Sequence, residues 1–162
     1  MTETFNKYIK DITDNSHFNK LKNELHHGIS RYEHSMRVAE WTYRICNTFK
    51  FDNTEEVTRA ALLHDFYTND DLVANGGAKA LVEHPSKALA NSKKYFEVSE
   101  LQEDIIKHHM FPCTIKLPEN KEAFLVSLVD KGVSTYEMLR FKAPLYASIY
   151  LLFLFELIKI SR

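Results

Sequence analysis

The chain is poor in the residues that build loops, phosphate-binding turns and covalent cross-links. Its 162 residues include only four glycines, four prolines and two cysteines. Such scattered glycines cannot form a glycine-rich phosphate loop, which argues against a doubly wound nucleotide-binding fold. Cys46 and Cys113 are too few for a disulfide framework or a zinc–thiolate site, and they suit a reducing compartment.

Charge and long apolar runs are also limited. Lysine and arginine number 21 against 22 acidic residues, so no basic excess favours duplex nucleic acid or an anionic membrane. The first 14 residues contain no apolar signal core, and we therefore expect a cytoplasmic protein. The longest uncharged run near the C-terminus, 143–155, is shorter than the roughly 20 residues of a membrane span.

What the sequence does contain is enough apolar material for one core. It is 44% hydrophobic, with 11 Phe, 8 Tyr and 1 Trp, and no linker divides it. Hydrophobic spacing of three to four residues predicts helices throughout, and we expect an all-α fold of about seven helices. We expect one domain over 1–162, with the motif-bearing core at about 30–140 and an apolar C-terminal helix at 144–158. That last helix is expected to be buried or covered in a homodimer, with no membrane span.

Local signals place several helix boundaries. Ser30 with Glu33, and Ser99 with Gln102, have the form of capping boxes that open helices. Apolar residues from Phe18 to Ile29 predict a helix that ends near Gly28. Pro118 predicts another helix start.

The stretch between the central helices has a different composition. Residues 66–83 are rich in Asn, Asp and Gly and are expected to form a loop. The sequence does not decide whether residues 66–80 form a lid. Pro85 fits the first turn of a helix, which would place His84 at its cap.

Polar residues on apolar helix faces are the most informative feature. His34 shares a stripe with Val38, and both His64-Asp65 and Asp130 follow runs of apolar residues. A carboxylate at such a position is costly unless it is paired or bound to a cation. Imidazole and carboxylate without thiolate favour Fe, Mn, Co, Ni or Zn, with Mg as a further candidate. The alternative is a core network of hydrogen bonds and ion pairs.

These residues resemble the H…HD…D signature of the HD-domain superfamily of metal-dependent phosphohydrolases. The likeness covers about residues 30–140 and includes the run Ala-Ala-Leu-Leu-His-Asp. It implies an all-helical bundle in which four side chains bind a divalent metal: His34, His64, Asp65 and Asp130.

Two further histidines resemble those of dinuclear members of the superfamily. The resemblance implies that Asp65 bridges two ions and that His84 and His109 complete the second site. His108 is the competing choice, and it points about 100° away from His109 on a helix. A helix cap for His84 and a solvated helix end for His109 are the simpler alternatives.

The resemblance also implies the chemistry. A metal-activated water, oriented by Asp65, would cleave a phosphoester or phosphoanhydride of a small phosphorylated metabolite, expected to be a nucleotide. Arg37 and Lys131 are the predicted phosphate contacts. The chain departs from the Ile-Gly-Lys and Gly-Tyr-Pro motifs of some members, with Phe66-Tyr67-Thr68 and Phe111-Pro112 at those places. The second departure lowers the expectation of a cyclic dinucleotide substrate.

Two other functions fit the same residues. Some proteins with the HD fold hold a mixed-valent di-iron site and oxidise their substrates with oxygen. A non-catalytic regulatory module could also keep the site for ligand binding. The sequence leaves open whether one or two ions bind.

Overall fold

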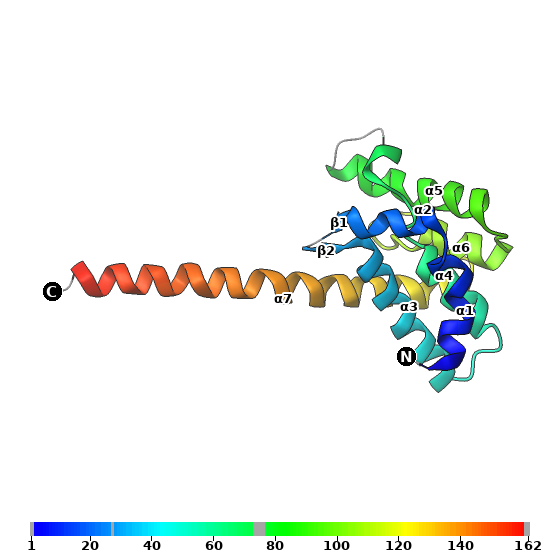
Figure 1. Cartoon of the computed structure of the whole chain (residues 1–162), viewed down its shortest axis with the longest axis horizontal. Helices are drawn as coiled ribbons and strands as arrows, with labels where there is room; N and C mark the ends of the chain where they lie inside the picture. The colour runs from blue at the N-terminus through cyan, green and yellow to red at the C-terminus, as the bar shows by residue number, and fades with distance from the viewer. Residues whose placement is uncertain (1, 27, 73–76, 161–162) are drawn as a thin grey trace.

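The computed structural model describes residues 2–26, 28–72 and 77–160. Within these ranges the chain forms seven α-helices and one short β-hairpin (Figure 1), which confirms the all-α fold predicted from the sequence. The elements are α1 (Glu3–Thr13), α2 (Ser16–Asn19), β1 (Leu25–His26), β2 (Ile29–Ser30), α3 (Arg31–Thr48), α4 (Thr54–Leu63), α5 (Gly77–Tyr95), α6 (Glu100–His108) and α7 (Lys121–Ile160), with short 3₁₀ turns η1 (Lys20–Asn23) and η2 (Asn69–Asp71).

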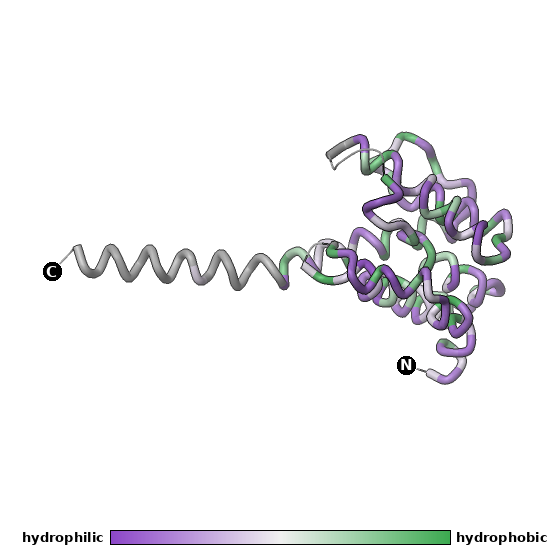
Figure 2. The backbone as a smooth tube through the Cα atoms, turned by 45° about the horizontal axis from the view of Figure 1, so that its top comes forward, coloured by the Kyte–Doolittle hydropathy of each residue, from purple (hydrophilic) through white to green (hydrophobic). Residues whose placement is uncertain are grey.

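Helix α4 lies at the centre of the domain. It packs against α3 and α6, while α7 packs against α3 and α6 and α5 packs against α6. Hydrophobic and hydrophilic residues alternate along the surrounding helices (Figure 2), as expected for helices with one buried face. In α4, by contrast, most positions are buried, including Ala60, Ala61, Leu62 and Leu63. The residues that follow α4 therefore lie in the interior of the domain.

The predicted capping boxes at two helix starts are confirmed. Ser30 accepts a hydrogen bond from the Glu33 amide, and the Glu33 carboxylate accepts one from the Ser30 amide. Ser99 and Gln102 make the same reciprocal pair at the start of α6. These caps fix where α3 and α6 begin.

The helix predicted from Phe18 to Ile29 is wrong. Phe18 and Leu21 are buried in α2 and η1, but the chain then turns into the hairpin, where Leu25 pairs with Ser30. Gly28 has φ 95°, a left-handed conformation that glycine adopts without a steric penalty. The evenly spaced apolar residues thus lie in two helical turns and in the two strands of the hairpin.

The prediction of a loop up to residue 83 is also wrong. Helix α5 already begins at Gly77, and Pro85 lies inside it, so His84 is within the helix rather than at its cap. Proline tends to interrupt helices because it has no amide hydrogen, but here α5 continues on both sides of it. The question of a lid over 66–80 involves residues 73–76, which lie outside the described residues.

The C-terminal helix is part of a longer one. Helix α7 begins at Lys121 rather than Pro118, and it includes 144–158 without a break (Figure 1). Side chains in 141–160, other than Ser148, lie outside the described residues, and with them the expectation of a buried or dimer-covered helix. In the part of the chain that the structure describes, we find no helix long and apolar enough to cross a bilayer.

Asp104 anchors the segment that connects α6 to α7. Its carboxylate accepts hydrogen bonds from His108 Nδ1 at 2.6 Å, from the Glu119 amide at 3.1 Å and from the Asn120 amide at 2.9 Å. Burial works to raise the pKa of Asp104, but these hydrogen bonds outweigh it and lower the pKa below 3.8. The charged carboxylate therefore holds the start of α7 in place.

We predict that Asp104→Asn destabilises the protein by about 1–3 kcal/mol at neutral pH, because buried and part-buried donors lose a charged acceptor. The depressed pKa means that this contribution is complete above pH 3.8 and is lost as the pH falls below that value. Urea unfolding at several pH values measures it. Asp52→Asn, at an exposed position, is the matched control. A difference from wild type that grows in acid would contradict the assignment.

Candidate metal centre

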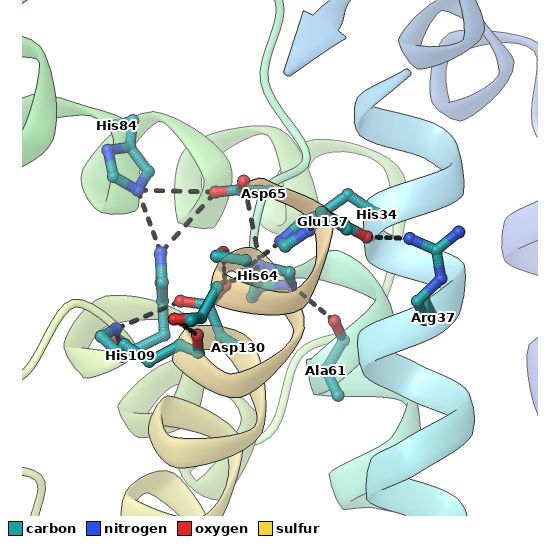
Figure 3. A network of polar contacts seen from close by, with 12 residues as sticks. His34, Arg37, Ala61, His64, Asp65, His84, His109, Asp130 and Glu137 are labelled. Atoms are coloured by element: carbon teal, nitrogen blue, oxygen red, sulfur yellow. Dashed lines mark hydrogen bonds and ion pairs between the residues drawn. The ribbon is translucent and has the colours of Figure 1, made fainter. Parts of the chain in front are cut away.

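All six side chains predicted as metal ligands lie together inside the domain (Figure 3). None of them is more than 7% exposed. They come from α3, from the chain just after α4, from α5, from the end of α6 and from α7, in the order His34, His64, Asp65, His84, His109 and Asp130.

Two of the histidines sit at helix C-termini that meet at this point. His64 follows α4 and donates from Nδ1 to the carbonyl of Ala61 at 2.7 Å. His109 follows α6 and donates from Nδ1 to the carbonyl of Ile106 at 2.8 Å. The two imidazole centroids are 4.9 Å apart. Helix C-termini carry partial negative charge, so both ends favour a cation between them.

One group of ligand atoms is formed by His34, His64 and Asp130. Asp130 Oδ1 lies 3.1 Å from His34 Nε2 and 3.7 Å from His64 Nε2. The nearest ligand atoms of the three residues all lie within 4.8 Å of one another. Ser134, one turn further along α7, donates to the same Asp130 oxygen at 3.3 Å. This group can hold a metal ion.

A second group surrounds Asp65. Its Oδ1 lies 3.4 Å from His84 Nε2 and 3.6 Å from His109 Nε2, and the two nitrogens are 3.0 Å apart. Ligand atoms about 2.0–2.2 Å from a tetrahedral ion are about 3.4 Å from one another, so these spacings match such an ion. His64 Nε2 lies 3.8 Å from the other Asp65 oxygen, and His64 thus adjoins both groups.

The protonation pattern leaves lone pairs that face one another. His84 donates from Nδ1 to the carbonyl of Ala80 at 3.1 Å, as His64 and His109 do to theirs. With Nδ1 protonated, each neutral imidazole carries its lone pair on Nε2, the atom that faces the cluster. His64 Nε2 is buried and makes no hydrogen bond to any described residue. Only a proton or a cation makes such a set of acceptors favourable, and the donor set fits a divalent metal.

The pKa values follow from burial and charge. Burial, helped by the neighbouring imidazoles of His64 and His84, lowers the pKa of His109 to about 3, and burial also lowers the pKa of His84. A proton between these two rings is therefore disfavoured near neutral pH. Burial lowers the pKa of His34 too, but hydrogen bonds to Asp130 and Glu137 outweigh it and raise the pKa to about 10. Burial raises the pKa of Asp130, whereas the neighbouring imidazoles of His34 and His64 hold it well below its usual range.

Glu137 is a member of the site that the sequence reasoning missed. It is fully buried, accepts from His34 Nδ1 at 2.8 Å and forms an ion pair with Arg37. A carboxylate on the far nitrogen of a metal-binding histidine fixes its orientation. The available signal was spacing, because Glu137 lies seven residues, or two helical turns, after Asp130 on α7.

The two predicted phosphate contacts lie beside the cluster with partners of their own. Arg37 pairs with Glu137, and Lys131 contacts Asp130 Oδ2 at 3.1 Å and the carbonyl of His109. Both side chains keep about a third of their surface exposed. Between the adjacent histidines, His109 joins the cluster, whereas His108 binds Asp104.

Comparison with known families agrees with this geometry. The family model described as HD domain matches residues 31–132, a range that includes all six clustered residues. Comparisons with curated proteins and with solved structures gave no match. Because the match covers more than half of the sequence, the chain belongs to the HD domain family, whose members are largely metal-dependent phosphohydrolases.

Proposed function

We propose that this protein is a phosphohydrolase that uses two divalent transition-metal ions. The proposal is carried by one observation: the Nε2 atoms of His64, His84 and His109, whose Nδ1 atoms donate to backbone carbonyls, converge with the carboxylates of Asp65 and Asp130 in the buried interior. The substrate class, a small phosphorylated metabolite and in particular a nucleotide, follows from the resemblance to the family rather than from the geometry.

The ligands divide into two overlapping sets. His34, His64, Asp65 and Asp130 would hold the first ion, and Asp65, His84 and His109 the second. The spacing of Asp65 Oδ1 from both His84 and His109 supports the second set. When bound, such ions lower the pKa of a coordinated water toward neutrality and balance charge on a phosphoryl group.

The chain's own residues supply orientation and charge. Asp65, between the two sets, would accept a hydrogen bond from the attacking water and so fix its direction. Lys131 and Arg37 would bind phosphoryl oxygens, Lys131 from beside Asp130 and Arg37 from beside Glu137. Glu137 would keep His34 oriented with Nε2 toward the ion.

We predict that Asp65→Asn abolishes phosphate release, because the amide cannot serve as an anionic bridging ligand. The assay is phosphate release from a panel of nucleotides and phosphate esters, with Mn²⁺ or Co²⁺ present. The helical circular dichroism signal should be retained. Asp70→Asn, an exposed carboxylate outside the cluster, is the control and should keep wild-type activity.

Retained activity in Asp65→Asn would overturn the assignment of this carboxylate. Oxygen consumption by the iron-loaded protein, without phosphate release from any compound, would instead favour the oxygenase alternative. No turnover of any kind, combined with a ligand-dependent rise in melting temperature, would favour a regulatory module.

The number of ions is measured by elemental analysis of protein purified without chelator. We expect about two transition-metal equivalents per chain in the wild type and about one in His84→Ala, because only the second set uses His84. His17→Ala, which changes a histidine outside the cluster, should stay at the wild-type value. Equal metal content in His84→Ala and wild type would remove His84 from the ligand set.

Glu137 has a separate test. Glu137→Gln should weaken binding of the first ion by about 10–100-fold, the usual effect of removing the partner of a metal-binding histidine. Titration with Co²⁺ followed by absorbance measures the affinity. Glu40→Gln, which removes a carboxylate paired with Arg44 on the domain surface, is the matched control. Unchanged affinity in Glu137→Gln would show that His34 needs no such support.

A further inference from the structure

Tyr67 occupies a position beside the cluster that the proposed function leaves without a role. It lies two residues after Asp65, is only 6% exposed, and donates its amide hydrogen to the Asp65 carbonyl at 2.8 Å. This hydrogen bond closes a tight turn after α4. The turn brings a large aromatic ring back against the ligands instead of carrying it to the surface.

The ring of Tyr67 packs against the imidazole of His84. Their centroids are 5.1 Å apart, with an angle of 31° between the planes. Burial raises the pKa of Tyr67, so the ring remains a neutral phenol beside the Asp65 carboxylate. A neutral aromatic ring at this distance restricts the rotation of the imidazole without competing for its nitrogen atoms.

Arg31 holds Tyr67 from the start of α3. Its guanidinium carbon lies 3.9 Å from the centroid of the Tyr67 ring, and Nη1 donates to the Tyr67 carbonyl at 2.8 Å. Nη2 donates to Asn69 at 3.3 Å, and Glu24 lies 3.5 Å away. Arg31 is 3% exposed, and a cation–π contact strengthens when it is removed from water. Both the backbone and the ring of Tyr67 are therefore fixed.

The orientation of His84 depends more on this ring contact than the orientations of His64 and His109, which also carry their proton on Nδ1. His64 and His109 follow helix ends and bind backbone carbonyls at 2.7 and 2.8 Å. His84 lies within α5, and its bond to the Ala80 carbonyl is longer, at 3.1 Å. Its position next to Asp65 and His109 thus depends on what packs against its ring.

We propose that Tyr67, held by Arg31, is a positioning residue for His84 and thereby for the second metal ion. The proposal rests on the two-ion function proposed above. It assigns to the ring of Tyr67, and not to its hydroxyl, the task of keeping His84 Nε2 directed at the site shared with Asp65 and His109.

The experiment is a titration of the metal-free full chain with Co²⁺, followed by the visible absorption spectrum and by metal content after desalting. In Tyr67→Leu we expect the first ion to bind as in wild type and the second about 10–100-fold more weakly, the usual cost of losing such a partner. Tyr67→Phe keeps the ring and should restore binding to within about threefold of wild type. Retention of the first ion shows that Tyr67→Leu is folded.

Tyr95→Leu is the matched control. Tyr95 stacks on His17, which is outside the cluster, with centroids 4.3 Å apart. Its substitution removes an aromatic neighbour from a histidine without touching the ligands. Both ions should bind to Tyr95→Leu as they do to wild type.

The outcomes separate this inference from the proposed function. Two ions bound with equal affinity by Tyr67→Leu and wild type would overturn the role of Tyr67 and leave the two-ion function in place. The role would also fall if Tyr67→Phe lost the second ion as Tyr67→Leu does, or if Tyr67→Leu lost both ions equally. Wild-type protein that binds no second ion would overturn both proposals.

Discussion

The arrangement of the domain depends on a concentration of hydrogen-bond acceptors at its centre. Helices α4 and α6 end at the same place, and each end directs a histidine Nε2 and the partial negative charge of its carbonyls inward. Asp65 and Asp130 add carboxylates to this point. Without positive charge such a cluster would be strongly unfavourable in a buried position. The packing itself therefore creates a place that can hold a cation, independently of family membership.

Positively charged side chains around the cluster balance the negative charge of its carboxylates. Arg37 compensates Glu137, which orients His34, and Lys131 lies against Asp130. Arg31 lies over the ring of Tyr67, which packs against His84. The cations thus sit around the ligands rather than among them. That arrangement leaves the ligand atoms facing one another, and part of the Lys131 and Arg37 side chains stays exposed.

Much of this site could be predicted from the sequence because its signals are local. The His64-Asp65 pair after a run of small apolar residues, and the serine caps of α3 and α6, depend on neighbours within a few positions. The helix expected from Phe18 to Ile29 was wrong because its apolar spacing serves both helical turns and a hairpin, and Gly28 decides between them through its backbone conformation. Glu137 and Tyr67 were missed because their roles arise from contacts across the fold, with His34 and His84.

Metal binding at His34 would be coupled to the loss of a proton. In the metal-free protein its pKa of about 10 keeps a proton on the imidazole at neutral pH, shared between hydrogen bonds to Asp130 and Glu137. Because a metal ion binds the neutral imidazole, binding must displace the proton from Nε2, while Nδ1 keeps its hydrogen bond to Glu137. The same two carboxylates that stabilise the protonated ring are therefore positioned to stabilise the metal-bound one.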